Sequence, residues 1–322
     1  MNTNFWPGKI APDFLLNLEG AAPATFYERY CGRTTVVLLA RDGMSLVPFV
    51  DFGSQTQLLA VISGSGVEAS LEGVPAVWDD GRIARAFLGR DRFEETVAVI
   101  LRPTLAVAAQ LVSPTKDSIE ACLAALPVEV EQVCTASAPV LMVPDSLPTE
   151  LCSKLISAHD ADNFESGMLR QRADEVALVP DPEIKKRRDH LLAEEDLVRD
   201  VTSALSERLL PAIARAFHYP VTRMESYKVV AYDAEKGGYF KLHRDNMTPD
   251  ARHRRFALSL NLNEDYEGGE LVFPEFGACL YRPPAAGALV FSGSHLHGAR
   301  EVTAGTRYVL LTFLWGDEVS SA

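Results

Sequence analysis

Cysteine is scarce in this sequence of 322 residues, and no two cysteines form a C-x-x-C pair. The five cysteines are Cys31, Cys122, Cys134, Cys152 and Cys279. An odd number of isolated cysteines is typical of a protein from a reducing compartment and argues against a disulfide scaffold. We therefore expect a cytoplasmic protein.

Long hydrophobic runs are also absent. No apolar run approaches the roughly 18 residues that a membrane-spanning helix needs. The first residues, MNTNFWPGKIAPDF, lack the basic start and the apolar stretch of a signal peptide. These absences predict a soluble protein without a membrane partner.

Positive charge is in the minority. The chain has 31 Lys and Arg against 44 Asp and Glu, which gives a formal net charge of −13. Nucleic-acid binding needs a basic surface that neutralises phosphates, so this balance argues against a nucleic-acid partner. The densest basic run, KKRR at 185–188, is soon followed by Glu194, Glu195 and Asp196. It is interpreted as a solvated helix face.

Apolar residues, at 47% of the chain, are plentiful enough for a globular protein, and the length exceeds that of one ordinary core. In the first part of the chain, apolar runs alternate with helix-like stretches such as Ser118–Leu126, where Ser118 is able to cap the helix start. A hairpin-like break at 102–104 separates two of these runs. The predicted strands are Thr35–Ala40, Leu58–Ser63, Val97–Leu101 and Leu105–Val112. Together they indicate an α/β unit built on a central sheet.

Three stretches of this unit resemble the peroxiredoxin (alkyl hydroperoxide reductase) family. They are PGKIAPDF at 7–14, TVVLL at 35–39 and WDDGRIARAF at 78–87. The resemblance covers most of the first 120 residues and implies a thioredoxin-like fold.

The chain departs from that family at the residue that matters most. The family places a nucleophilic cysteine after the strand that matches Thr35–Ala40, whereas this chain has RDGMSLVP at 41–48. Peroxide reduction needs a thiolate, and Cys31 precedes the strand, toward the wrong end of the sheet. We predict a thioredoxin-like domain without peroxidase chemistry. Dimerisation, substrate presentation and simple stability all remain open as its role.

The second half of the chain begins with helices and continues with strands. Glu194–Phe217 has apolar residues spaced by four, as in an amphipathic helix. The predicted strands after it are Tyr227–Tyr232, Ala257–Leu262, Glu270–Phe273, Ala288–Phe291 and Tyr308–Trp315. Helices followed by many antiparallel strands favour a double-sheet jelly roll.

We therefore predict a two-domain α+β protein. Residues 1–126 would form the thioredoxin-like α/β domain and 127–138 a linker. Residues 139–322 would form a double-stranded β-helix (jelly roll) with supporting helices.

Metal-binding residues are indicated in two places. His243 and Asp245 are two residues apart, so on an extended segment they point to one side and can hold one ion. Farther along, GSHLHG at 293–298 supplies a further histidine, either His295 or His297. Two histidines and one carboxylate form the facial triad of non-haem iron(II) oxygenases.

An arginine begins the last predicted strand. Arg307, Val309 and Leu311 alternate onto one face, and an arginine at the start of an apolar inward stripe needs an anionic partner. The distal carboxylate of 2-oxoglutarate would suit it through a bidentate contact. The alternative is an arginine that points into solvent at a strand end.

Taken together, these motifs resemble the catalytic domain of the prolyl 4-hydroxylase-like 2-oxoglutarate/Fe(II) oxygenases, over 139–316. The pattern is H-x-D at 243–245, GGEL at 268–271, and then His297 with Arg307 ten residues later. The resemblance implies that His243, Asp245 and His297 are the iron ligands. It implies that Arg307 binds the C5 carboxylate of 2-oxoglutarate, and that either Tyr232 or Tyr239 helps to bind this cosubstrate. His295 would then lie beside the ligands or contact the substrate.

The implied activity is hydroxylation of an unactivated C–H bond, with Fe(II), 2-oxoglutarate and O2, release of succinate and CO2, and ascorbate as a candidate reductant. The substrate stays open among a peptidyl proline, a free amino acid and a small natural product. The loops 163–182 and 246–252 are the expected rims of its pocket. Rival interpretations are a zinc hydrolase, a jelly-roll protein that only binds metal, and a redox role for the N-terminal domain. A homodimer through that domain is a further expectation.

Overall fold

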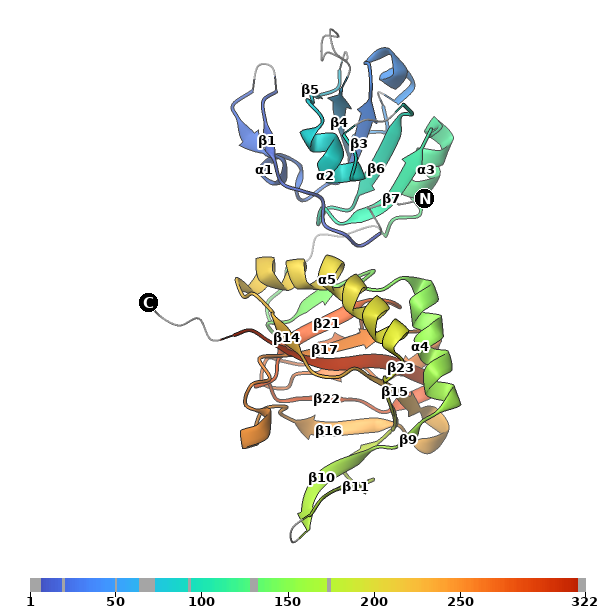
Figure 1. Ribbon diagram of the computed structural model, residues 1–322, viewed down its shortest axis with the longest axis vertical. Coiled ribbons are helices and arrows are strands. Elements are labelled where there is room, and N and C mark those ends of the chain that lie inside the picture. The colour runs from blue at the N-terminus through green and yellow to red at the C-terminus, as the bar shows by residue number, and fades with distance from the viewer. Residues whose placement is uncertain are drawn as a thin grey trace, which may run out of the picture. The chain divides into compact units, whose positions relative to one another are not determined.

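The computed structural model describes residues 7–18, 21–49, 51–63, 73–91, 94–127, 133–172 and 175–317. The chain divides into two compact units, Met1–Glu131 and Gln132–Ala322, each with its own sheets (Figure 1). The division falls inside the stretch 127–138, where the sequence has no sustained periodicity.

The N-terminal unit is built on a five-stranded sheet with the order β5-β4-β3-β6-β7. Strands β3, β4 and β5 are parallel, while β6 and β7 run antiparallel to their neighbours. The strands are β3 (Thr34–Ala40), β4 (Thr56–Ile62), β5 (Ala76–Trp78), β6 (Val97–Leu101) and β7 (Val107–Val112). A short hairpin of β1 (Leu15–Leu16) and β2 (Ala24–Thr25) precedes them. The predicted α/β unit with a hairpin break after residue 101 is confirmed.

Helices cover this sheet on both faces, which explains why its central strand β3 is apolar and buried from Val36 to Ala40. The helices are α1 (Phe26–Tyr30), α2 (Arg82–Leu88) and α3 (Lys116–Ala124), with a 3-10 helix at Met44–Phe49. Val37 of β3 packs in one core with Phe26 of α1 and Phe87 of α2. Its neighbour Val36 packs in a second core with Ile119 of α3. Successive residues of β3 therefore serve opposite cores.

The start of α3 differs from the sequence prediction. Thr115 caps the helix: its hydroxyl accepts a hydrogen bond from the Ser118 amide, and the Ser118 hydroxyl accepts one from the Thr115 amide. The helix therefore begins at Lys116, and the predicted start at Ser118 is wrong by one half-turn. The physical reason is that the reciprocal pair satisfies two backbone donors, whereas Ser118 alone would satisfy one.

The C-terminal unit is rich in antiparallel sheet. Its larger sheet has the order β8-β21-β17-β23-β15-β13-β9, with β14 and β18 also paired to β23, and its smaller sheet has the order β12-β16-β22-β19-β20. The larger sheet contains β8 (Leu141–Val143), β9 (Phe164–Glu165), β13 (Arg188–Leu191), β14 (Arg223–Met224), β15 (Lys228–Asp233), β17 (Phe256–Asn261), β18 (Tyr266–Gly268), β21 (Ala288–Ser292) and β23 (Val302–Trp315). The smaller sheet contains β12 (Lys185–Lys186), β16 (Tyr239–His243), β19 (Leu271–Val272), β20 (Leu280–Tyr281) and β22 (His297–Ala299). A separate hairpin joins β10 (Gly167–Arg172) to β11 (Glu175–Pro180).

The C-terminal unit has three layers, two sheets and a helical layer, because side chains along the strands point alternately to two cores. Val230 of β15 and Phe291 of β21 pack against Leu271 of β19, so one core lies between the two sheets. Val229 points the other way and packs in a second core with Leu205 of α5. Helices α4 (Thr149–Ala161) and α5 (Glu195–Phe217) cover that outer face, as Figure 1 shows. The predicted helix at 194–217 and the predicted strands are thus confirmed to within a few residues, except that β23 begins earlier.

The basic run at 185–188 is not a helix face, so that prediction is wrong. Lys185 and Lys186 form β12, and Arg188 begins β13. Lys185 is buried, and only 7% of the Arg187 side chain is exposed. Pairing with β16 on one side and β15 on the other fixes this segment as a strand, and such long-range pairing is invisible in the charge pattern.

Among the described residues, no helix combines the length and the apolar character that a bilayer crossing requires.

Leu205 tests the contribution of the helical layer to stability. It is fully buried in α5, and its replacement by alanine would leave a cavity against the larger sheet. We expect Leu205→Ala to lower the free energy of unfolding by about 2–5 kcal/mol. Urea denaturation followed by circular dichroism measures this change. The exposed neighbour Ser206 is the matched control, and Ser206→Ala should change stability by less than about 0.5 kcal/mol. Equal midpoints for the two variants would show that α5 does not contribute a core.

Candidate metal centre and its pocket

The pairing of two short strands brings the first and last metal-ligand candidates together. In the smaller sheet, β16 pairs with β22 so that His243 lies directly opposite His297. Asp245 follows the end of β16, and its amide donates to the Gly293 carbonyl oxygen at 2.9 Å. A side chain at Gly293 would place a Cβ 2.8 Å from the Arg254 carbonyl oxygen, so glycine is needed for this close approach. The sheet register thus places the two histidines, and the turn after β16 places Asp245.

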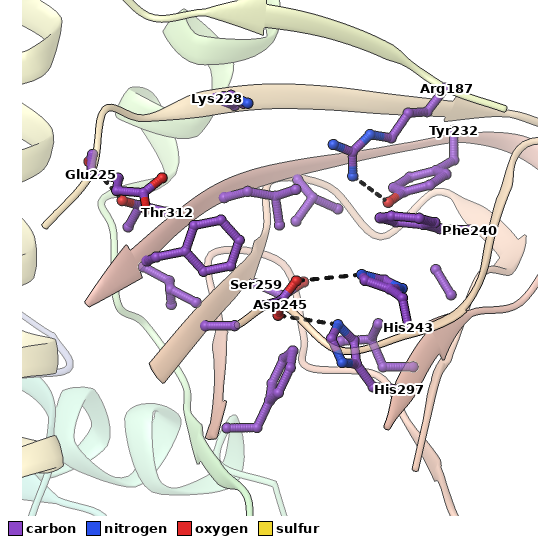
Figure 2. A pocket seen from close by; sticks show the side chains of 18 of the residues that line it. Arg187, Glu225, Lys228, Tyr232, Phe240, His243, Asp245, Ser259, His297 and Thr312 are labelled. Atoms are coloured by element: carbon purple, nitrogen blue, oxygen red, sulfur yellow. Dashed lines mark hydrogen bonds and ion pairs between the residues drawn. The ribbon is translucent and has the colours of Figure 1, made fainter. Parts of the chain in front are cut away.

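Three ligand atoms converge at this point. The Nε2 atoms of His243 and His297 each lie 3.4 Å from a different oxygen of the Asp245 carboxylate (Figure 2). The three ligand atoms all lie within 4.8 Å of one another. Within the described part of the chain, no other set of three or more His, Cys, Asp or Glu residues meets this criterion. The structure thus selects His297 over His295 as the partner of the H-x-D motif.

Backbone carbonyls orient both imidazole rings. The Nδ1 atom of His243 lies 2.8 Å from the Lys241 carbonyl oxygen, and the Nδ1 atom of His297 lies 3.0 Å from the His295 carbonyl oxygen. A carbonyl oxygen only accepts, so each Nδ1 carries the proton and each Nε2 keeps its lone pair. This is the arrangement that metal-binding histidines use. Burial also lowers the pKa of His297, which favours its neutral, coordinating form.

The Asp245 carboxylate shows that a cation fits the site. Its Oδ2 atom is buried and has no hydrogen-bond partner among the described residues. A buried anionic oxygen that faces the lone pairs of two imidazoles is costly unless a cation lies between them. Two histidines and one carboxylate suit iron(II), and they leave other coordination positions open.

Aromatic rings hold the histidines in place. Phe240 stacks on His243 with ring centroids 3.7 Å apart, and Phe291 packs edge-on against His297 at 4.5 Å. Arg254 donates to the Asp245 carbonyl oxygen at 3.2 Å and is itself fixed by Glu225 at 2.6 Å. These contacts restrict the rotamers of the ligands before any metal arrives.

The three ligands line one side of a pocket between the two sheets. The cavity of this pocket measures about 100 Å³. Val309, Leu311 and Phe313 of β23 make much of its wall apolar.

Arg307 lies in this pocket as a buried cation without an anionic partner. It is 1% exposed, and it donates to the Asn261 side-chain oxygen at 2.9 and 3.2 Å and to the Ser259 hydroxyl at 3.4 Å. No carboxylate among the described residues forms an ion pair with it. The prediction that Arg307 points inward is confirmed. Its environment therefore calls for an anion from outside the protein.

The two candidate tyrosines lie in different places. Tyr232 lines the pocket and is paired with Arg307 across β15 and β23. The Tyr239 hydroxyl instead donates to the Pro182 carbonyl oxygen at 2.7 Å, and Tyr239 does not line the pocket. His295 lies in the loop before His297, packed against Phe276 at 4.8 Å, and it does not line the pocket either. Of these three residues, only Tyr232 is placed to meet a ligand there.

Arg187 is a charged pocket residue that the sequence did not indicate. It lines the pocket beside Tyr232, from the segment between β12 and β13. The available signal was the spacing of Lys185, Arg187 and Asp189, which are two residues apart and would share one face of a strand. The surrounding charges hid that alternation.

Comparison with known proteins agrees with this geometry. The model of the 2OG-Fe(II) oxygenase superfamily matches residues 227–315. A PKHD-type hydroxylase of Xanthomonas campestris pv. campestris (strain B100) is 27% identical over 191 residues, which are 55% of this chain and 77% of that protein. The PKHD-type hydroxylase PiuC of Pseudomonas aeruginosa is 34% identical over 88 residues, which are 24% of this chain and 38% of that protein.

Solved structures with a partial likeness include two prolyl hydroxylases. One, from Trichoplax adhaerens in complex with a hypoxia inducible factor peptide, is 16% identical with a TM-score of 0.45, covering 58% of this chain and 89% of that one. The other, a prolyl-4-hydroxylase of Pseudomonas putida, is 19% identical with a TM-score of 0.43, covering 56% and 93%. Residues 227–315, which contain His243, Asp245, His297 and Arg307, are therefore similar to the 2OG-Fe(II) oxygenase superfamily, and this part of the chain is also similar to the PKHD-type hydroxylases.

Proposed function

We propose that this chain is an Fe(II)- and 2-oxoglutarate-dependent dioxygenase that hydroxylates an unactivated C–H bond. The observation that carries the proposal is the presence of both halves of such a site in one pocket: the His243, Asp245 and His297 ligand set, and the buried Arg307. Bound together, Fe(II), 2-oxoglutarate and O2 supply the oxidant for hydroxylation, with succinate and CO2 as products.

Each residue has a separate task in this proposal. His243, Asp245 and His297 would hold the iron. Arg307 binds the C5 carboxylate of 2-oxoglutarate through its guanidinium, and Tyr232 assists it. The apolar wall of β23 excludes water from the reacting groups.

A zinc hydrolase or a protein that merely holds metal would need no buried guanidinium in the pocket. Arg307 is expensive to bury without an anion, and a dicarboxylate cosubstrate compensates that cost. This supports the oxygenase over both rivals. The substrate is proposed to be a small molecule or a peptide that carries a prolyl-like or other aliphatic C–H bond, with ascorbate as a candidate reductant.

The N-terminal unit is proposed to be a peroxiredoxin-related, thioredoxin-like domain without peroxidase chemistry. The order of its sheet, with parallel β3–β5 and antiparallel β6 and β7, supports this. A 3-10 helix at Met44–Phe49, which contains no cysteine, follows β3. We further propose a cytoplasmic protein that dimerises through this domain and binds no nucleic acid.

His297→Ala tests the metal site. Anaerobic titration of the metal-free protein with Fe(II) and 2-oxoglutarate should give a weak visible charge-transfer band in the wild type and none in His297→Ala. His295→Ala is the matched control, since it removes a histidine from the same loop that lies outside the ligand set, and it should keep the band. A band in His297→Ala but not in His295→Ala would reverse the ligand assignment. Failure of the wild type to give a band at saturation, with zinc found by metal analysis, would favour the hydrolase.

Arg307→Met tests the cosubstrate assignment. Loss of two charge-assisted hydrogen bonds, each of about 1.5 kcal/mol, should raise the KM for 2-oxoglutarate by roughly 100-fold. Succinate release at varied 2-oxoglutarate measures it. Arg307→Lys keeps the charge without the bidentate geometry and should fall between the wild type and Arg307→Met. An unchanged KM in both variants would exclude Arg307 from cosubstrate binding.

A further inference from the structure

Arg187 lines the pocket and is buried, but it is already paired with a carboxylate and so does not act as a second anion-binding arginine. Its Nε and Nη2 atoms donate to the two oxygens of Asp189 at 2.8 and 3.3 Å. Burial alone would raise the pKa of Asp189, but Arg187 and the Ser166 hydroxyl hold that pKa below its ordinary value. Both side chains of the Arg187–Asp189 pair are therefore ionised, and their opposite charges cancel.

Asp189 is held in place by a further hydrogen bond. It is 4% exposed, and it accepts a hydrogen bond from the Ser166 hydroxyl at 2.7 Å. The Arg187 guanidinium also lies against the rings of Tyr232 and Phe240, with its central carbon 5.8 and 5.3 Å from their centroids. A planar group held by a bidentate partner at one end and by two rings along its sides has little rotational freedom.

The remaining nitrogen of Arg187 determines what the Tyr232 hydroxyl can do. Nη1 donates to the Tyr232 oxygen at 3.0 Å, as the dashed line in Figure 2 shows. A guanidinium has no lone pair to accept with, so the Tyr232 proton must point elsewhere. No acceptor for it is present among the described residues. Tyr232 lines the pocket, and its ring lies 5.7 Å from the central carbon of the Arg307 guanidinium.

We propose that Arg187 is a positioning residue that fixes the Tyr232 hydroxyl as a hydrogen-bond donor toward the cosubstrate carboxylate, beside Arg307. The inference rests on the proposed binding of 2-oxoglutarate and deepens it. Arg187 acts through Tyr232 and does not touch the cosubstrate. The charge of Arg187 is neutralised by Asp189. Arg187 therefore orients the Tyr232 hydroxyl proton and adds no net positive charge to the pocket.

A double-mutant cycle between Arg187 and Tyr232 tests this coupling. Arg187→Met alone would leave Asp189 buried and unpaired, so Asp189→Asn is introduced with it to keep the fold. The quantity measured is the apparent Kd for 2-oxoglutarate, from the charge-transfer band in the presence of saturating Fe(II). We expect Arg187→Met/Asp189→Asn and Tyr232→Phe each to raise this Kd by about 10- to 100-fold, the effect of one hydrogen bond to a charged group. The triple variant should bind 2-oxoglutarate no more weakly than the weaker-binding of the two, because both changes abolish the same hydrogen bond from Tyr232 to the cosubstrate.

Two controls separate positioning from a general structural role. Arg188→Met removes the neighbouring arginine, which bonds to Asn163 and does not line the pocket, and it should leave the Kd unchanged. The affinity for Fe(II) alone should be the same in all variants, whereas a distorted pocket would lower it. If the two effects multiply in the triple variant, or if the Arg187 and Asp189 changes leave the Kd unaltered, the inference is overturned. A wild type that binds no 2-oxoglutarate at all would instead refute the proposed function.

Discussion

The pairing of β16 with β22 is the constraint on which the rest of the site depends. It sets His243 opposite His297 and brings the Asp245 amide to the Gly293 carbonyl. A strand slipped by one residue would turn either histidine to the other face of the sheet and separate the ligand atoms. Because the rings are also fixed by backbone carbonyls and stacked aromatics, the ligand set is organised by the protein itself. A metal ion that binds there would meet side chains that are already ordered.

The larger sheet contributes the complementary half of the pocket. The register of β15 and β23 pairs Tyr232 with Arg307, and β17 brings Asn261 and Ser259 to the same guanidinium. The candidate metal ligands His243 and His297 thus come from the smaller sheet, and the buried Arg307 comes from the larger one. The core between these sheets determines the separation of the two groups, so packing in that layer has a direct chemical role.

The sequence was most informative where chemistry depends on short spacings. His243 and Asp245 are only two residues apart, and the alternation that begins at Arg307 lies on β23, so the grouping of these residues depends mainly on local geometry. Arg187 escaped prediction because pairing with distant strands decides whether the run at 185–188 is helix or strand. The choice between Tyr232 and Tyr239 also depends on distant parts of the chain. Tyr232 lines the pocket, whereas the Tyr239 hydroxyl bonds to the Pro182 carbonyl oxygen.

The pairing of charges inside the pocket has a consequence for its affinity for anions. Glu225 is compensated by Arg254, and Arg187 by Asp189, which leaves Asp245, Arg307 and the more exposed Lys228 as the other charged residues of the lining. Without a bound cation, the negative charge of Asp245 offsets part of the positive charge of Arg307 and Lys228. A cation held by Asp245 would remove that offset, so the carboxylate of the candidate metal centre also controls how strongly the pocket attracts an anion.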